Sequence, residues 1–362
     1  MIDAKVRYAV VGLGHIAQEA ILPAFAHADE TCELSALISS DKTKLAQLSK
    51  EYEIEHSGSY DDLERILEEA DVDAAYIALP NAHHRVFTER CARVGVHVLC
   101  EKPMATTEED CEAMIHVCDE NDVKLMIAYR LHFDPANLHA IDIAQSGRIG
   151  ELRYFSSTFG QEVRKHDIRL KPELGGGALF DMGIYCINAA RYLFRDEPEA
   201  VFAVQASSDG VDETTAGVLQ FPGDRFAQVI ASLVSADVDE YRIVGTKGDL
   251  RLEPAYAYDG EITHHLTVGD DSTTMRFPTS DQFAPELLHF AECILEDDDP
   301  EPSGEEGLAD VRIIEAMLDS ARSARLVKLP PFTRARRPSL ELEMTKPPVK
   351  RPKIVRAPSP TK

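Results

Sequence analysis

The stretch "VRYAVVGLGHIA", residues 6–17, decides how the chain begins to fold. Its first half is apolar enough for a buried strand, and its second half has the pattern G-x-G-x-x-A at Gly12, Gly14 and Ala17. Glycines at these positions allow a tight turn and a close approach of backbone to a pyrophosphate, and the following helix N-terminus supplies free N–H groups. A mere tight turn is the alternative. The strand before the motif and the helix after it favour dinucleotide binding.

The same alternation of apolar strands and amphipathic helices continues to about residue 130. Further strands are expected at 33–39, 73–80, 96–103 and 123–130, with helices between them. Strand–helix alternation with short apolar strands predicts a parallel, doubly wound sheet over residues 1–130. Ligands on such sheets bind beyond the carboxyl ends of the strands.

After about residue 150 the pattern changes to successive strand-like segments joined by turns, which are typical of antiparallel hairpins. Helices are expected at 177–195, 282–296 and 305–325. The sequence therefore predicts a second α/β domain over 131–329. The last segment, 330–362, holds eight of the twenty prolines and little periodicity, which predicts an extended arm.

Composition narrows the class of protein. No apolar run approaches the roughly 18 residues that a membrane span needs, and the first residues lack the architecture of a signal peptide. Seven cysteines, an odd number, are scattered through expected helices and strands, which indicates free thiols and a reducing compartment. We therefore expect a cytoplasmic protein with no membrane partner.

The charge is distributed unevenly along the chain. The formal net charge is −25, but residues 330–362 alone carry +7 and the remainder carries −32. A body this acidic repels nucleic acid, so no nucleic-acid partner is expected. Two structures are possible for the basic arm. It could wrap along a partner subunit with a complementary surface, or it could be a disordered tail.

The tip of the second expected strand bears on which dinucleotide is bound. Enzymes that use NAD usually place Asp or Glu there to hold the ribose hydroxyls. This chain has Ser39 and Ser40, followed by Lys42 and Lys44, and hydroxyl and ammonium groups suit the 2′-phosphate of NADP. Asp41 leaves two alternatives open. A small shift of register would bring it to the ribose of NAD, or it caps the helix that follows.

Two more strand ends carry polar groups toward the same edge. Asn81 and His84 follow one strand, and Lys102 follows the next, directly before a proline that restricts the local backbone. Lys102 is therefore expected to be held in place, although a surface lysine in a turn would look the same. His84 could touch the cofactor or cap its helix. Arg130, at the end of the next strand, could contact substrate or cofactor, or form a salt bridge.

A third polar group lies far downstream, in "GGGALFDMGIYCIN", residues 175–188. Asp181, Tyr185 and Asn188 are spaced i, i+4 and i+7, so a helix places them on one face. The preceding glycines permit a sharp turn and leave room for a ligand. If this face lines a pocket, the three side chains can bind hydroxyl groups. Alternatively, Tyr185 packs in the core and Asp181 is a capping or surface acid.

Five segments in this order resemble the glucose–fructose oxidoreductase / inositol dehydrogenase / rhizopine-catabolism (GFO/IDH/MocA) superfamily of NAD(P)-dependent sugar oxidoreductases. They are "VVGLGHIA", "ALPNAHH", "CEKPMATT", "YRLHFDPAN" and "GGGALFDMGIYCINAARYL", and the resemblance covers about residues 5–330. The inositol dehydrogenase branch usually has histidine where Tyr185 stands, so this chain resembles the tyrosine branch instead. The spacing of Ser39 and Lys44 also resembles NADP-using members.

The resemblance implies an α/β fold: an N-terminal Rossmann domain with a doubly wound parallel sheet, and a C-terminal α/β domain with a large open, mainly antiparallel sheet. The exposed face of that sheet often forms the oligomer contact in the family, so a homodimer or homotetramer is expected. The residues expected at the cofactor are Gly12, Gly14, His15, Ile16, Ser39, Ser40, Lys44, Leu79, Pro80, Asn81, His84, Glu101, Lys102 and Arg130.

The resemblance also places Lys102, Asp181 and Tyr185 where a sugar meets the nicotinamide. Arg130, from its place at a strand end, is expected as a further substrate contact. A free tyrosine phenol titrates near 10, and an adjacent ammonium favours its anion. We therefore expect Tyr185 to act as general acid/base, Lys102 to stabilise it and orient the substrate oxygen, and Asp181 to hold a neighbouring hydroxyl. No spacing of His or Cys indicates a metal site.

The expected function is an NADP-dependent oxidoreductase of carbohydrate metabolism. Aldose 1-dehydrogenase and glucose–fructose or aldose–aldose oxidoreductase are the leading forms, with 1,5-anhydrofructose reductase and trans-dihydrodiol dehydrogenase as alternatives in the same site. An NADP-binding sensor or regulator without catalysis is the alternative of another class. The presence of Lys102, Asp181 and Tyr185 together disfavours such a sensor.

Overall fold

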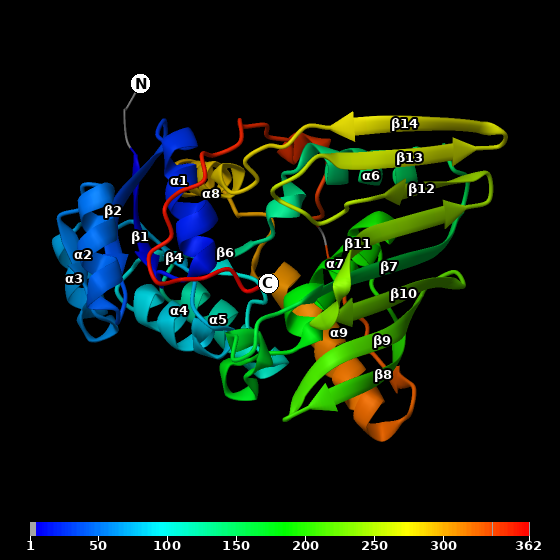
Figure 1. Ribbon diagram of the computed structural model, residues 1–362, viewed down its shortest axis with the longest axis horizontal. Coiled ribbons are helices and arrows are strands. Elements are labelled where there is room, and N and C mark those ends of the chain that lie inside the picture. Colours follow the sequence, from blue (N-terminus) through cyan, green and yellow to red (C-terminus); the bar gives the residue numbers. More distant parts are fainter. Residues whose placement is uncertain (1–4, 335, 362) are drawn as a thin grey trace.

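A computed structural model of the protein describes residues 5–334 and 336–361, and its strands form two separate sheets (Figure 1). The first has six strands in the order β3-β2-β1-β4-β5-β6, and every neighbouring pair is parallel. This confirms the predicted doubly wound sheet. Its strands are β1 (Val6–Val11), β2 (Cys32–Ile38), β3 (His56–Gly58), β4 (Ala74–Ile77), β5 (His97–Glu101) and β6 (Leu125–Ala128).

Helices cover both faces of this sheet because its strands are apolar on both sides. Along β1, Ala9 and Val11 belong to one core, and Tyr8 and Val10 belong to the other. The first core contains residues of α3 (Leu63–Glu69), α4 (His84–Ala92) and α5 (Glu108–Glu120). The second contains residues of η1 (Ala17–Ile21), α1 (Leu22–Ala24), α2 (Lys42–Glu51) and α8 (Ala284–Glu296).

Helix α8 lies in the sequence range predicted for the second domain, but it packs on the first sheet. The hydroxyl of Tyr8 in β1 donates a hydrogen bond to the backbone oxygen of Leu287, at 3.0 Å. Leu287 and Phe290 are fully buried in the second core. The first domain is therefore completed by a helix that comes from near the end of the chain.

The second sheet has nine strands in the order β14-β13-β12-β11-β7-β10-β9-β8-β15. All of its pairs are antiparallel except β7 with β10, which is parallel. The prediction of a mainly antiparallel sheet is confirmed. The strands are β7 (Leu152–Glu162), β8 (Ala200–Ser208), β9 (Val211–Phe221), β10 (Arg225–Ser232), β11 (Val234–Gly245), β12 (Gly248–Leu252), β13 (Ile262–Val268), β14 (Asp271–Phe277) and β15 (Val327–Lys328).

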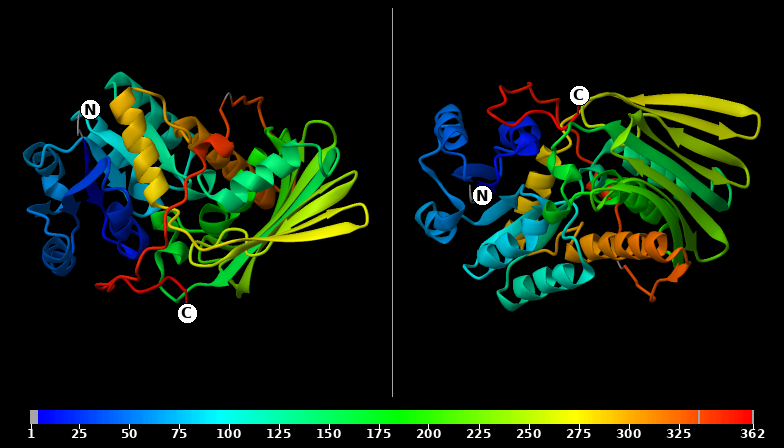
Figure 2. Two further views of the ribbon diagram at one scale, coloured as in Figure 1. Left: turned by 90° about the horizontal axis from the view of Figure 1, so that it is seen from above. Right: turned by 60° about the horizontal axis from the view of Figure 1, so that its bottom comes forward.

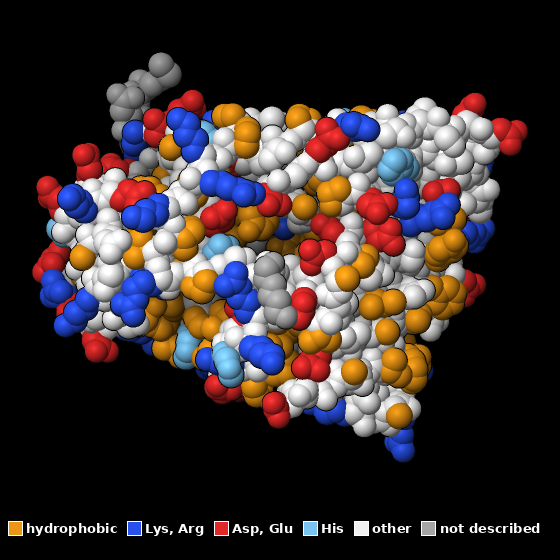
Figure 3. Space-filling view, viewed as in Figure 1, with side chains coloured by type: hydrophobic (Ala, Val, Ile, Leu, Met, Phe, Trp, Pro, Cys, Tyr) orange, Lys and Arg blue, Asp and Glu red, His pale blue; other side chains and the backbone are white. Residues whose placement is uncertain are grey.

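Only one face of the second sheet is covered. Helices α6 (Pro135–Gln145), α7 (Ile184–Phe194) and α9 (Gly304–Ser323) pack on it, and within the described residues no helix lies on the opposite face (Figure 2). That outer face is apolar over β8, β9, β10 and β7, where hydrophobic side chains gather in Figure 3. Its exposed large side chains include Phe202, Val204, Val218, Phe226 and Tyr154.

A buried ionic network joins α7 to α9. The guanidinium of Arg191 is fully buried and donates to the carboxylates of Glu197, Glu306 and Asp310. The shortest N···O distance to each carboxylate is 2.7 Å. Charges buried in this way are tolerated because each is paired and hydrogen-bonded. The network fixes the two helices that support the inner face of the second sheet.

The C-terminal arm packs against its own chain. Arg334 and Arg337, both almost fully buried, join the same network through Glu301, Glu306 and Glu197. Farther along, the backbone N–H of Asp281 donates to the oxygen of Lys346, at 3.0 Å. The described residues of the arm include one helical turn, at Leu340–Leu342. Over the residues that the structure describes, the arm lies along its own acidic body.

No helix of residues 5–334 and 336–361 combines the length and the apolar composition that crossing a bilayer would require.

Replacing Arg191 with methionine is expected to lower the free energy of unfolding by about 3–5 kcal/mol. The reason is that buried carboxylates lose their central partner without regaining water. Urea unfolding measures the loss. Arg93→Met is the matched control, because Arg93 is exposed and its pair with Glu89 lies on a helix surface, where such pairs contribute about 0–1 kcal/mol. Equal losses in the two variants would contradict this account of the network.

Candidate active site

The carboxyl ends of the parallel strands bring the predicted groups of the first domain to one edge. β1, β4, β5 and β6 are neighbours in that order. Gly12 follows β1, Asn81 lies four residues after β4, Lys102 follows β5 and Arg130 lies two residues after β6. Since parallel strands end at the same edge, the four residues face one region between the two domains.

The glycine loop has the geometry that a dinucleotide needs. Gly12 has φ +100°, and a Cβ there would stand 2.4 Å from the backbone oxygen of Ala78 and 2.9 Å from a methyl of Leu79. Only glycine therefore lets β1 turn beside the end of β4. A Cβ at Gly14 would meet nothing within 4 Å, so open space lies in front of this backbone. Ile16 is half-buried and packs against the second core of the first domain.

The tip of β2 resolves the two alternatives for Asp41. Its carboxylate accepts the backbone N–H groups of Thr43 and Lys44, so it is the N-cap of α2. Ser39 is buried and its hydroxyl accepts the N–H of Asp41. Ser40 is exposed, and Lys44 is half-buried beside it. The groups of this tip that remain available to a ligand are hydroxyl and ammonium rather than carboxylate.

The three glycines before Asp181 have distinct structural roles. Gly175 and Gly177 have φ of +77° and +138°, which favour glycine. A Cβ at Gly176 would stand 2.4 Å from the backbone oxygen of Arg169. The amide of Asn81 donates to the oxygen of Gly175 at 2.8 Å, so this loop is tied to the first domain. The glycines therefore permit close packing between the two domains directly before η8 (Leu179–Gly183).

Lys102, Asp181 and Tyr185 meet across the two domains. The Lys102 ammonium lies 4.6 Å from the centroid of the Tyr185 ring and donates to the backbone oxygen of Asp181 at 3.1 Å. It also lies 3.8 Å from Oδ1 of Asp181. The side chains of Lys102 and Asp181 are 13% and 17% exposed, so water screens the interaction between their charges only weakly.

Asp181 has a second cationic partner that the sequence gave no reason to expect. Nε of Arg169 donates to Oδ2 of Asp181 at 2.7 Å, and Arg169 is itself held by Asp167 at 3.2 Å. Burial alone would raise the pKa of Asp181, but the Arg169 guanidinium and the Lys102 ammonium outweigh it and lower that pKa. Asp181 is therefore a carboxylate at neutral pH. Arg169 lies in a segment without periodicity, so no pattern identified it.

Arg130 also contacts Tyr185. Its Nη2 donates to the Tyr185 hydroxyl at 3.3 Å and to the backbone oxygen of Tyr256, and its Nη1 donates to Gln282. The guanidinium is almost fully buried and lies 5.2 Å from the centroid of the Tyr185 ring and 5.4 Å from that of Tyr258. It contacts the phenol directly, and among residues 5–334 and 336–361 it forms no salt bridge of the kind considered from the sequence.

Asn188 does not lie with Asp181 and Tyr185. Its amide nitrogen donates to Glu306 and Asp310, and its oxygen lies 2.9 Å from Nε2 of His132, all within the buried ionic network. The expected polar face is therefore divided. Its first two residues point to the junction between the domains and the third points into the core.

His84 and Glu101 are both buried. The ring of His84 is fully buried between the backbone oxygens of Leu79 and Pro103, each at 2.9 Å. Glu101 accepts a hydrogen bond from Tyr76, and burial raises the pKa of its carboxyl. We propose that His84 holds the loops after β4 and β5 in place, including half-buried Leu79 and Pro80, and makes no cofactor contact of its own.

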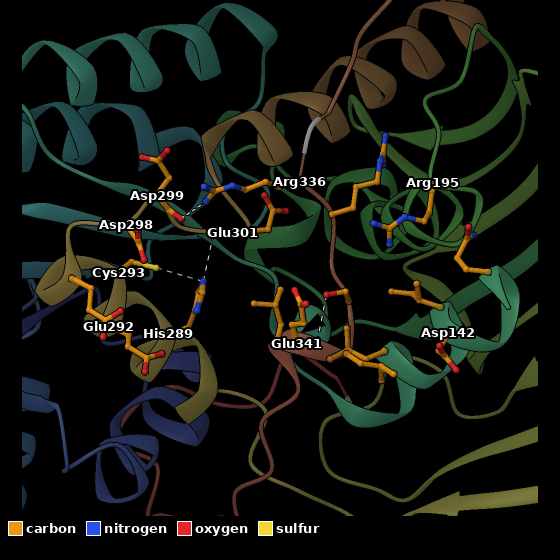
Figure 4. A pocket seen from close by; sticks show the side chains of 18 residues that line it. Asp142, Arg195, His289, Glu292, Cys293, Asp298, Asp299, Glu301, Arg336 and Glu341 are labelled. Atoms are coloured by element: carbon orange, nitrogen blue, oxygen red, sulfur yellow. Dashed lines mark hydrogen bonds between the residues drawn. The ribbon is translucent and has the colours of Figure 1, made fainter.

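A separate cavity of about 950 Å³ lies between α6, α8 and the C-terminal arm (Figure 4). His289, Glu301 and Arg336 line it. Neither Lys102 nor Tyr185 does, so this cavity is distinct from the junction described above.

Comparisons with known proteins identify the family of this chain. Residues 6–129 match the model of an oxidoreductase family with an NAD-binding Rossmann fold, GFO/IDH/MocA, and residues 138–251 match the C-terminal domain of that family. The chain is 36% identical to a D-xylose 1-dehydrogenase [NADP(+)] of Haloarcula marismortui, over 90% of this chain and 94% of that protein.

Solved structures extend the likeness. The crystal structure of an aldose-aldose oxidoreductase from Caulobacter crescentus, complexed with glycerol, superposes with a TM-score of 0.85 at 39% identity and covers 90% of this chain and 100% of that one. The 3-ketoreductase KijD10 of Actinomadura kijaniata, in complex with NADP and TDP-benzene, has a TM-score of 0.80 at 28% identity, over 87% of this chain and 98% of that one.

Replacing Arg169 with glutamine is expected to raise the pKa of Asp181 and to destabilise the protein by about 1–3 kcal/mol at pH 7, because a buried carboxylate loses its charged donor. In the wild-type protein the pKa of Asp181 is lower in the folded than in the unfolded state, so its stabilising effect is present above about pH 4 and is lost as the pH falls. The difference between wild type and variant should therefore shrink toward pH 3.

Urea unfolding at pH 7 and at stepwise lower pH measures this difference. Arg65→Gln serves as the control, because Arg65 forms exposed pairs with Asp62 and Glu69. A difference for Arg169→Gln that grows as the pH falls would contradict the assignment of an ionised Asp181.

Proposed function

We propose that this chain, which belongs to the GFO/IDH/MocA family of oxidoreductases, is an NADP-dependent enzyme. It transfers hydride between nicotinamide and a small sugar. The observation that carries the proposal is the meeting of Lys102 and Tyr185, an ammonium from one domain and a phenol from the other, at the edge where the glycine loop ends. Acid–base chemistry on a sugar hydroxyl needs such a pair beside the dinucleotide.

NADP is favoured over NAD by the tip of β2. Asp41 is engaged through Oδ1 as a helix cap, which favours that role over holding the ribose hydroxyls of NAD. The exposed Ser40 and the ammonium of Lys44 suit a 2′-phosphate. The relatives named above support this choice, since the xylose dehydrogenase of Haloarcula marismortui uses NADP and KijD10 binds it.

The three site residues have separate tasks in the oxidation of a sugar hydroxyl. Tyr185 reacts as its anion and takes the hydroxyl proton, and the Lys102 ammonium and the hydrogen bond from Arg130 stabilise that anion before the transfer. Lys102 donates to the substrate oxygen, and the ionised Asp181 accepts from a neighbouring hydroxyl. When bound, NADP supplies the acceptor for the hydrogen and both electrons of the substrate C–H bond.

An aldose that is oxidised at its anomeric carbon is the substrate we propose first. The relatives support it, because the two curated xylose dehydrogenases are 36% and 30% identical over 90% and 89% of this chain. Transfer between two aldoses is the second candidate, and the Caulobacter crescentus structure, at a TM-score of 0.85, supports it. All seven cysteines are free and buried, which supports the cytoplasm as the compartment.

Tyr185→Phe is expected to reduce turnover by about 10²–10⁴-fold, the usual contribution of a general acid–base group, with little change in the affinity for NADP. Absorbance at 340 nm with D-xylose and other aldoses measures turnover, and fluorescence titration measures NADP binding. Tyr52→Phe is the matched control, since Tyr52 lies at the end of α2.

Unchanged turnover in Tyr185→Phe would remove Tyr185 from the mechanism. The wild-type protein also separates the enzyme from the sensor alternative. Reduction of NADP by any aldose of the panel supports the enzyme, whereas tight binding of NADP without reduction by any of them supports a sensor.

The outer face of the second sheet is where we propose that two copies of the chain meet. In the sheet register, Val218 pairs with Phe202 on one side and with Gln228 on the other, and Phe226 pairs with Tyr154. These side chains lie together on an exposed face without a covering helix among the described residues. A contiguous exposed apolar patch marks a protein interface.

Val218→Asp is expected to dissociate the oligomer, because it places a charge in the middle of this apolar face. Analytical ultracentrifugation over a range of concentrations measures the mass in solution. Val86→Asp is the matched control, since Val86 is 54% exposed on α4 of the first domain, against 42% for Val218. An unchanged oligomer in Val218→Asp would place the interface elsewhere.

A further inference from the structure

The last ten described residues of the arm, 352–361, cross from the first domain to the second in front of the glycine loop. In Figure 1 this segment, in red, runs past α1 and then turns toward the middle of the molecule. The arm is anchored before it arrives there, by the buried pairs of Arg334 and Arg337 and by the contact of Lys346 with Asp281. These contacts fix the part of the arm that precedes residue 352.

The arm contacts the first domain at the motif itself. The buried amide of Gln18 accepts the backbone N–H of Val355 at 2.7 Å and donates to the backbone oxygen of Val355 at 3.0 Å, while also donating to the oxygen of Leu13. Nδ1 of His15 lies 3.1 Å from the oxygen of Ala357. Val355 is 6% exposed and belongs to the core of the first domain. These contacts join the arm to two residues, His15 and Gln18, of the turn and helix that would hold a pyrophosphate.

Between Val355 and Ala357 the chain bends, and Arg356 projects to the tip of β2. Arg356 has φ +50°, an uncommon conformation for a residue with a side chain. Its Nη1 lies 3.2 Å from the hydroxyl of Thr43 and 3.4 Å from Oδ1 of Asp41. Asp41 is the helix cap described above, so Arg356 shares an acceptor that two backbone N–H groups already use.

Arg356 and Lys44 are close enough to repel each other. Burial lowers the pKa of the Lys44 ammonium, Asp41 opposes this, and Arg356 lowers that pKa further. Arg356 is also 63% exposed, so its guanidinium can reorient at low cost. A dianion placed between the two cations would relieve the repulsion, and a guanidinium can bind a phosphate through two parallel hydrogen bonds.

The end of the arm then reaches the second domain beside η8. The backbone N–H of Arg164 donates to the oxygen of Pro360 at 2.8 Å, and Val163 and Thr361 form an isolated antiparallel bridge. Val163 packs in a small core with Ala178 and Met182, on either side of Asp181 in the sequence. The arm therefore spans from the glycine loop to the segment that carries Asp181.

We propose that residues 352–361 form a strap over the bound dinucleotide and that Arg356 and Lys44 together bind the 2′-phosphate of NADP. The inference rests on the proposed function, because it takes NADP as the ligand. It adds a cofactor-binding residue, Arg356, that lies 315 positions from Asp41 in the sequence. It also assigns the C-terminal arm a role in retaining the cofactor.

Arg356→Ala is expected to weaken NADP binding by about 10-fold or more, the usual effect of removing a charged hydrogen bond, and to leave NAD binding unchanged. Isothermal titration with NADP, NAD, 2′,5′-ADP and 5′-AMP measures the effect without turnover. Arg351→Ala is the matched control, because Arg351 is an exposed arginine of the same arm that pairs with Asp259. Its affinity for NADP should equal that of the wild type.

A second variant that ends at Lys350 tests the strap. It is expected to release NADPH faster than the wild type in a stopped-flow displacement experiment, and to release NADH faster as well, since coverage does not depend on the 2′-phosphate. Circular dichroism verifies that it remains folded.

The proposal is overturned if Arg356→Ala binds NADP as tightly as the wild type. It is also overturned if the shortened chain binds NADPH more tightly, because the arm would then compete with the nucleotide. A wild-type protein that binds no NADP would instead refute the proposed function itself, so the two failures are distinguishable.

Discussion

The contact on which the site depends is that of the Lys102 ammonium with Asp181 and Tyr185, which belong to the other domain. Four charged side chains and a phenol lie there with little access to water, so each contributes only while the others are in place. Arg169 balances Asp181, which prevents that carboxylate from being neutralised by burial. Arg130 approaches the phenol oxygen from another direction. The two domains must therefore be fixed relative to each other before any of these groups can act.

Several features of the fold meet that requirement. Helix α8 comes from near the end of the chain and completes the first domain. Asn81 in the first domain holds the glycine loop that precedes Asp181. The arm adds a third connection, with contacts to Gln18 at one end of its last ten residues and to Arg164 at the other. Its positive charge lies on a body of net charge −32, so the long-range field favours the position that the short-range contacts select.

Much of the architecture was predictable because it depends on neighbours in the sequence. The period-two and helical patterns, the glycine turn and the hairpins predicted both sheets, and Asp41 was recognised as a possible helix cap. The parallel pairing of β7 with β10 and the packing of α8 were not predicted, because they join segments far apart in the chain. Periodicity indicates that a face is buried, and it does not indicate what buries it. For the same reason Asn188 was placed on the face of Asp181, whereas its partners are Glu306 and Asp310.

By itself, the sequence determined the two sheets and the dinucleotide loop, since these follow from local geometry and from motifs a few residues long. The resemblance to the family implied which residues we propose for the acid–base group. The tertiary structure alone decided which charges meet. Lys102 and Asp181 are 79 residues apart, Asn188 and Glu306 are 118 apart, and Arg356 and Asp41 are 315 apart. The physical reason is that electrostatic and hydrogen-bond energies depend on distances in space of a few ångströms. A local sequence pattern does not specify those distances, because folding alone brings such distant residues together.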